Sequence, residues 1–295
     1  CAEGLSNLGK AVKMVLTHRT IFRVMFLGFL LPVSWVWGGD WPTYRHDNSR
    51  SGVTKEALAL PLNLAWKYQS AHAPAPAWPG PAKFDYMNSP DTPEDPRVIF
   101  DRVFHVVASD DLIYFGSSVN DKVYCLDATS GKERWSFFTE GPVRLAPTIA
   151  AGKVYVGSDD GRVYCLDARE GTLLWQYFPT SAEHRICGNE RMVSLWPVRT
   201  SILVHNGNAI FCAGIFPSQG VYFVTLDAQT GVEKSKEQIS VSSQGYLRIQ
   251  EGKLYTPTGR GGPESVSDIT GGAAGGQLTA PEAYPYAIIR AGNTL

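Results

Sequence analysis

A segment of this sequence recurs after 40 residues. Residues 122–138 read KVYCLDATSGKERWSFF, residues 162–178 read RVYCLDAREGTLLWQYF, and the six letters VYCLDA are identical in both. A third copy occupies residues 208–234 and contains LDAQTGVEK, and a fourth begins at 252–259 with GKLYTPTG. A period near 40 residues with several short strands per copy is typical of propeller blades, so the repeat predicts a row of similar β-sheets.

The spacing of the copies also locates what does not repeat. Residues 62–69, LNLAWKYQ, resemble the ends of the first two copies, so we expect an outer strand of an earlier blade there. The LDA of the third copy follows that of the second by 60 residues, which places an insertion at 180–200. A second insertion, 71–104, begins with AHAPAPAWPGPAKF, and its Pro and Ala content indicates an extended segment.

Residue types within the copies favour strands over helices. Residues 123–126 and 154–156 are apolar at every position, as expected for strands that are buried on both faces. Asp160-Gly161 lies between two such strands and predicts a two-residue hairpin turn. Helical periodicity is absent from the repeats. We therefore predict an all-β fold, a β-propeller of four-stranded blades.

Each copy places an Asp, a Gly and, in two copies, a Trp at fixed spacing. The Asp side chain can accept backbone N–H groups in a turn, the Gly tolerates positive φ, and the Trp can pack on the adjacent blade. Ser235 stands where the third copy would have its Trp, which puts that blade contact in doubt. The residues of this structural motif are Asp127, Gly131, Trp135, Asp167, Gly171, Trp175, Asp227 and Gly231.

This motif resembles the tryptophan-docking motif of pyrroloquinoline quinone (PQQ) propeller repeats, Ala-x-Asp-x-x-x-Gly-x-x-x-Trp. Cys125 and Cys165 replace the Ala in the two full copies. The segment Trp41-Pro42-Thr43-Tyr44-Arg45 also resembles the start of exported members of that family. The resemblance covers roughly residues 62–260.

The resemblance implies two classes of function. Quinoprotein dehydrogenases of this fold hold PQQ and Ca²⁺ near the propeller axis, whereas non-enzymatic members, such as the lipoprotein of the outer-membrane protein assembly machinery, dock other proteins. Many of the dehydrogenases have adjacent cysteines, which this sequence lacks, and turn structure already accounts for Asp127, Asp167 and Asp227. No catalytic residue and no metal ligand is therefore assigned.

We expect a noncatalytic binding or scaffold module that recognises a protein or a small-molecule ligand at a propeller face. The alternative is a PQQ- and calcium-dependent alcohol or sugar dehydrogenase, and only under this alternative are PQQ and calcium expected. Whether the protein is an enzyme stays open at this point, with the balance against.

The insertion at 180–200 carries the candidate cofactor-binding residues, because binding residues concentrate on loops over a rigid scaffold. Its three arginines could clamp a carboxylate, and the side-chain oxygens of Asn189 and Glu190 could bind Ca²⁺. The alternative is a polar loop whose charges are solvated or paired. The candidates are Arg185, Asn189, Glu190, Arg191 and Trp196, with Arg199 as the third arginine of the clamp. In the earlier insertion, Trp78 and Phe84 could stack on a planar ligand or pack against the propeller.

The amino-terminal residues indicate export. Lys13, Arg19 and Arg23 precede an apolar run at 24–37, which is shorter than the ~20 residues of a membrane-spanning helix. This pattern predicts a signal peptide within residues 1–39, with Met14 as the candidate translation start; a buried helix and an uncleaved anchor are the alternatives. We expect a periplasmic or cell-surface protein without a membrane span after signal removal.

Charge and cysteine content exclude other classes. The net charge of −1 gives no basic field for nucleic acid. Five cysteines are too few for a disulfide scaffold, and none has the spacing of a zinc site. A disulfide between Cys187 and Cys212 stays open.

The sequence divides into four parts. Residues 1–39 are the upstream residues and signal peptide, 40–61 an amino-terminal segment, 62–260 the blades with their insertions, and 261–295 a Gly-rich degraded or truncated blade. About 40 residues per blade leaves room for about five blades, fewer than the seven or eight of this propeller type, so we expect a fragment.

Overall fold

A computed structural model describes residues 39–57, 60–77, 101–188, 191–258, 265–268 and 276–277. All of them belong to one compact unit, Trp37–Leu295. The expected signal peptide lies outside the described residues except for Gly39, as do Trp78, Phe84, Asn189 and Glu190. Most of the Gly-rich tail lies outside them too.

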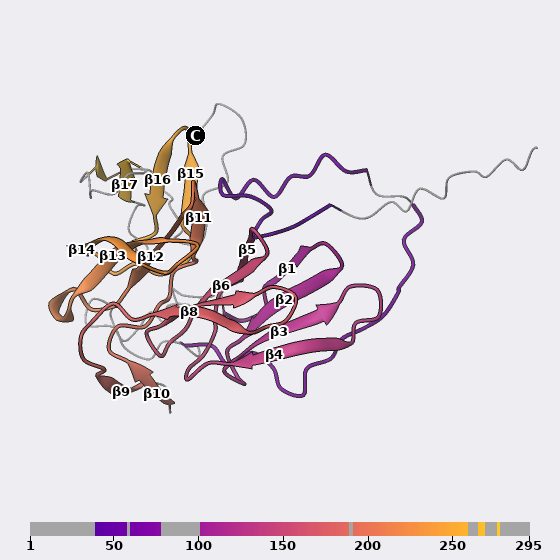
Figure 1. Ribbon diagram of the computed structural model, residues 1–295, viewed down its shortest axis with the longest axis horizontal. Coiled ribbons are helices and arrows are strands. Elements are labelled where there is room, and N and C mark those ends of the chain that lie inside the picture. The colour runs from indigo at the N-terminus through magenta and orange to yellow at the C-terminus, as the bar shows by residue number, and fades with distance from the viewer. Residues whose placement is uncertain are drawn as a thin grey trace, which may run out of the picture. The chain divides into compact units, whose positions relative to one another are not determined.

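Sixteen of the eighteen described strands form four antiparallel sheets of four strands each, and each of these sheets keeps its strands in chain order (Figure 1). The first blade consists of β1 (Val106–Ser109), β2 (Leu112–Ser117), β3 (Lys122–Asp127) and β4 (Glu133–Phe138). The second consists of β5 (Thr148–Ala150), β6 (Lys153–Gly157), β7 (Val163–Asp167) and β8 (Leu173–Tyr177).

The third and fourth blades follow with the same topology. The third consists of β11 (Leu203–His205), β12 (Asn208–Ala213), β13 (Val221–Asp227) and β14 (Glu233–Ile239). The fourth consists of β15 (Arg248–Gln250), β16 (Lys253–Thr256), β17 (Ser265–Asp268) and β18 (Gly276–Gln277). The insertion adds a hairpin of β9 (Arg185–Gly188) and β10 (Arg191–Ser194), and a short 3₁₀ turn covers Pro217–Gln219. The prediction of an all-β fold with four-stranded blades is confirmed.

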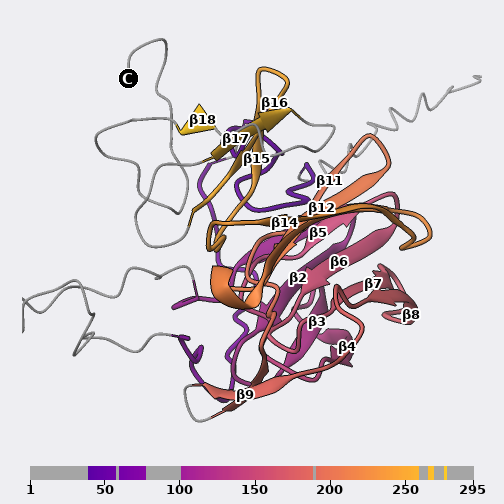
Figure 2. The same ribbon diagram turned by 90° about the vertical axis from the view of Figure 1, so that its left-hand side faces the viewer.

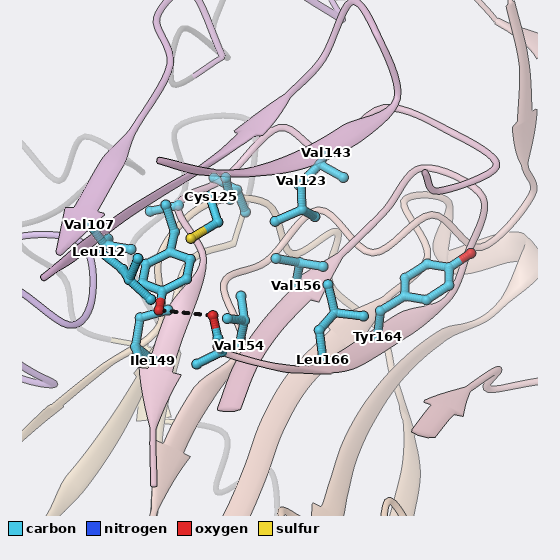
Figure 3. Packing of buried hydrophobic residues seen from close by; sticks show 14 of the residues in the cluster. Val107, Leu112, Val123, Cys125, Val143, Ile149, Val154, Val156, Tyr164 and Leu166 are labelled. Atoms are coloured by element: carbon cyan, nitrogen blue, oxygen red, sulfur yellow. Dashed lines mark hydrogen bonds between the residues drawn. The ribbon is translucent and has the colours of Figure 1, made fainter. Parts of the chain in front are cut away.

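The middle strands of neighbouring blades form the core. Figure 3 shows Val123 and Cys125 of β3 opposite Val154 and Val156 of β6 and Leu166 of β7. These five side chains are at most 2% exposed. Continuous apolar runs suit these strands because each pleat face packs on a different sheet, which removes both faces from water.

Tryptophans join successive blades. In each of three docks an indole ring lies against a positive-φ glycine of the next blade, and its N–H donates to the carbonyl of a neighbouring alanine. These groups are Trp66 with Gly131 and Ala128, Trp135 with Gly171 and Ala168, and Trp175 with Gly231 and Ala228. The N–H···O distances are 2.8, 3.0 and 3.2 Å.

The glycines in these docks are required for two reasons, their positive φ and the close approach of the indole ring. Gly171 has φ +69°, and a Cβ placed on it would lie 2.4 Å from Cδ2 of Trp135, well inside van der Waals contact. Any other residue would therefore be strained in its backbone and would also displace the indole.

Turn aspartates hold the loops that present these glycines. Oδ1 of Asp127 accepts the backbone N–H groups of Thr129 and Ser130 at 3.1 and 2.8 Å. Asp167 and Asp227 make the same pair of bonds to the residues two and three positions further on. The connection that contains Asp160-Gly161 is longer than the two residues predicted, since its closing backbone bond joins Ser158 N to Arg162 O.

The two ends of the repeat array, residues 62–69 and the fourth blade, keep only part of the repeat motif. Residues 62–69 are not assigned to a strand, yet Trp66 docks like the outer-strand tryptophans of the next two blades. In the strand register of the fourth blade, the backbone of Asp268 lies opposite that of Lys253, as Asp167 lies opposite Lys153 in the second blade. Asp268 therefore occupies the turn-aspartate position, which the sequence analysis did not predict. Gly276 takes the backbone place of the tryptophan there, because it pairs two residues before this Asp.

An amino-terminal segment crosses the first strands of all four blades. Trp41 pairs with Ala108 of β1, and Pro42 O accepts Ile149 N of β5 at 2.7 Å. Asn48 donates its side chain to Val204 O of β11 at 2.8 Å and accepts Ile249 N of β15 at 2.7 Å. Figure 2 shows this indigo segment beside β11 and β15.

Candidate functional site

Two short segments lead into the second and third blades and carry the same tripeptide, Pro-Val-Arg. Val143 and Val198 fix these segments, because a Cβ on Gly116 would lie 2.3 Å from Val143 Cγ1 and one on Gly157 2.4 Å from Val198 Cγ1. The valines thus fill the space that the glycines leave open, and Arg144 and Arg199 each stand four residues before the first strand of their blades.

Both guanidinium groups converge on Asp159. Arg144 Nε donates to Oδ2 at 2.7 Å, and Arg199 donates from Nε to Oδ1 and from Nη2 to Oδ2, each at 2.9 Å. The side chain of Asp159 is fully buried and those of both arginines are 5% exposed. Burial alone would raise the pKa of Asp159, but the guanidinium groups of Arg199 and Arg144 outweigh it and lower the pKa.

Asp101 extends this ion cluster into the insertion at 71–104. Its Oδ2 accepts Arg144 Nη1 at 2.8 Å and Ala77 N at 2.7 Å, while Arg144 Nη1 also donates to Ala75 O at 2.8 Å. Oδ1 of Asp101 is buried without a hydrogen-bond partner. The cluster therefore ties residues 75–77 to the second blade.

The hairpin β9–β10 is held to the blades by its own arginines. Arg191 donates to Ser118 O at 3.1 Å, to Val119 O at 2.8 Å and to Asp121 Oδ1 at 2.6 Å, all in the connection between β2 and β3. Arg185 pairs with Glu140, in the loop that follows β4. Ser194 N donates to Asp159 O at 2.7 Å, so the hairpin contacts the ion cluster through the backbone.

Trp196, another candidate of this insertion, is buried and makes its contacts within the chain. It is 9% exposed, its Nε1 donates to Gln219 O at 2.8 Å, and its ring stacks on His184. The three arginines of the expected clamp are not brought together on one anion, since Arg185, Arg191 and Arg199 pair with three different carboxylates of the chain. The alternative interpretation, a polar loop with paired charges, describes these three.

The cysteines divide into buried and exposed. Cys212 is buried in β12 and Cys187 is exposed in β9, and both are free thiols, so the structure contains no disulfide between them. Burial raises the pKa of Cys125 and of Cys165 to about 12, which keeps these two thiols protonated at neutral pH.

The described acidic residues do not form a Ca²⁺ site, and the candidate ligands Asn189 and Glu190 lie outside the described residues. Within the described ranges, no cluster of three or more His, Cys, Asp or Glu side chains could hold a metal ion. The two most buried carboxylates already accept arginine donors.

The described part of the chain also has no helix long and apolar enough to span a membrane.

The sequence interpretation missed Asp101, Arg144 and Asp159. The available signal was the repeated Pro-Val-Arg at 142–144 and 197–199, which marks equivalent places in two blades. Asp159 carried no comparable signal, because the matching residue of the first blade is Ser118.

A family model described as outer membrane protein assembly factor BamB matches residues 96–273. The chain belongs to this BamB family. Its four-stranded blades and tryptophan docks are those of a PQQ-like propeller, as the sequence motif predicted. No curated protein sequence matches the chain.

Solved structures place the BamB family chain among propellers. BamB from Moraxella catarrhalis is 18% identical, with 57% of this chain and 46% of that one covered and a TM-score of 0.43. Quinohemoprotein alcohol dehydrogenase from Comamonas testosteroni is 18% identical over 77% of this chain and 36% of its own, with a TM-score of 0.51. A europium-containing methanol dehydrogenase is 13% identical over 75% and 43%, with a TM-score of 0.51. The chain thus spans less than half the length of each of these proteins, and the likeness to the two dehydrogenases shows the fold alone.

Proposed function

We propose that this protein is an exported, noncatalytic binding scaffold of the BamB family. The observation that carries the proposal is the match of residues 96–273 to a family described as an assembly factor for outer membrane proteins. The ion cluster supports it, because both carboxylate oxygens of Asp159 accept hydrogen bonds from Arg144 and Arg199, so Asp159 is not free to act as a base.

The proposed ligand is a protein, bound at a propeller face in the periplasm or at the cell surface. Export rests on the signal-like segment 1–39 and on the family description. The docks and the ion cluster join the blades and insertions through buried contacts, and such rigid surfaces suit recognition with little ordering cost. The candidates Arg185, Arg191 and Trp196 then serve to hold the insertion in place.

A PQQ- and calcium-dependent alcohol or sugar dehydrogenase is the second candidate. The fold it shares with the Comamonas testosteroni alcohol dehydrogenase favours it. In such an enzyme the cofactor would accept the substrate hydride, and the protein would position the substrate and remove its proton.

An activity assay separates the two. The purified chain is incubated with PQQ and Ca²⁺, and dye-linked oxidation of ethanol and of glucose is followed against a protein-free control. The scaffold proposal predicts no rate above that control. Saturable turnover that requires both PQQ and the protein would overturn it in favour of the dehydrogenase.

A further inference from the structure

The outer strands β4, β8 and β14 hold the same place in three successive blades. Each ends its sheet, so one edge of each has no strand partner among the described strands. Their first two residues are equivalent, because in every blade the first one pairs with the leucine before the turn aspartate. These pairs are Glu133-Arg134 in β4, Leu173-Leu174 in β8 and Glu233-Lys234 in β14.

In the first and third blades the second residue of this pair neutralises the turn aspartate. Arg134 Nη2 lies 2.8 Å from Oδ2 of Asp127, and Lys234 Nζ lies 3.0 Å from Oδ2 of Asp227. The repeat thus places one cation at the start of each of these two outer edges.

The second blade lacks that cation. Leu174 occupies its position, and within the described residues no Lys or Arg pairs with Asp167, which receives the N–H groups of Arg169 and Glu170. Leu173 and Leu174 are 44% and 46% exposed. The strand Leu-Leu-Trp-Gln-Tyr carries no charge at all.

Charged residues on an edge strand oppose pairing with another chain, and an uncharged apolar edge permits it. β4 and β14 carry such charges, whereas β8 has two exposed leucines and a carboxylate beside them. The second blade is therefore the one whose outer edge is chemically suited to receive a strand.

We propose that the β8 edge binds an extended strand of a partner protein, which places an apolar side chain against Leu174 and a basic side chain beside Asp167. The proposal rests on the protein-binding function above and names its surface and the chemistry of its partner. Main-chain hydrogen bonds supply affinity in this mode and alternate side chains supply specificity.

Charge complementarity argues against a second copy of this chain as the occupant. The β8 strand of a second copy carries no Lys or Arg, so it cannot supply the basic side chain that Asp167 lacks. A partner strand with a Lys or Arg restores the ion pair that the neighbouring blades make internally.

The test uses a synthetic peptide that alternates Val and Thr and carries one Arg, and a second peptide with Glu in place of this Arg. Binding to the full chain is followed by fluorescence anisotropy, and amide hydrogen exchange locates the bound peptide. The variant Leu174→Arg copies the residue that the first blade carries at this position, so Asp167 can pair with it. Val232→Arg is the matched control, since it also replaces an exposed apolar residue by arginine, but in the third blade rather than in β8.

We expect the Arg peptide to protect the amides of 173–177, and Leu174→Arg to weaken its binding by at least about tenfold while Val232→Arg does not. The Glu peptide should bind the native chain more weakly, a result that does not depend on any variant. Equal binding of both peptides, equal binding to Leu174→Arg, or protection outside β8 would overturn the proposal. So would self-association of the native chain that Leu174→Arg abolishes. A negative result here with no quinone turnover overturns this surface only, whereas quinone turnover overturns the scaffold function itself.

Discussion

Single side chains decide how one blade meets the next. Trp135 rests on Gly171 and bonds to Ala168 O, so one residue links the outer strand of the first blade to the turn of the second. The contact depends on the absence of a Cβ at 171 as much as on the ring. The two residues should therefore be coupled in their effects on stability.

We expect Trp135→Ala to lower the free energy of unfolding by about 2–4 kcal/mol, near the lower part of the range for a large aromatic because the ring is only partly buried. Gly171→Ala should cost more in the native protein than in the Trp135→Ala background, where the indole no longer opposes the new Cβ. Gly152→Ala is the control, since Gly152 has φ +71° and nothing within 4 Å of its Cβ position, so it should cost only ~1–2 kcal/mol of backbone strain. Urea unfolding measures all of these values. An identical cost of Gly171→Ala in both backgrounds would show that the dock does not form.

Asp159 is the second residue on which the molecule depends. Replacing it with Asn leaves buried Arg199 without a carboxylate and leaves Arg144 with Asp101 alone, and we expect the free energy of unfolding to fall by about 3–5 kcal/mol. Asp121→Asn, in the half-exposed pair with Arg191, is the control and should cost less than ~1 kcal/mol.

The substitution Asp159→Asn should also change how the free energy of unfolding depends on pH. The folded-state pKa of Asp159 lies below the ordinary value of 3.8, so its stabilising contribution is full above that value and is lost as the pH falls through the lower, folded-state pKa. Unfolding titrations at pH 7, 5 and 3 should therefore show a smaller acid loss for Asp159→Asn than for the native protein. A parallel decline of both proteins would contradict this.

At the scale of elements, the sequence allowed the blades to be predicted better than the insertion. Strands such as 123–126 could be identified because burial on both faces requires an unbroken apolar run. The partners of Arg185, Arg191 and Arg199 could not, since each lies 40 or more residues away in the chain. Charge and loop position suggested ligand binding, but those features also fit arginines that hold a hairpin to neighbouring blades.

The hairpin β9–β10 should loosen when its main arginine is removed. Arg191→Ala deletes three hydrogen bonds to the β2–β3 connection, so we expect amide exchange in β9 and β10 to rise by about tenfold while β6 and β12 stay protected. Arg169→Ala is a matched control, because that exposed arginine also reaches the first blade but makes no contact with the hairpin. Unchanged exchange in β9 and β10 would mean that Arg191 does not hold the hairpin.

At the scale of the whole molecule, successive blades are joined in two ways. Tryptophan docks link neighbours from Trp66 to Gly231, and the segment 41–50 contacts the first strand of every blade. Arg50 is buried in this segment, where its Nε donates to Leu247 O and its Nη1 to Thr43 Oγ1. These links produce a framework in which the buried arginines and carboxylates hold the fold together, and this supports the proposed binding scaffold.

Under the proposed function, this BamB family propeller recognises proteins and does not bind a quinone. Calorimetric titration of the purified chain with PQQ in the presence of Ca²⁺ tests it most directly, because binding is measured independently of any substrate. We expect heats equal to those of dilution and an unchanged melting temperature at every PQQ concentration. Saturable binding with a rise in melting temperature that depends on Ca²⁺ would contradict it.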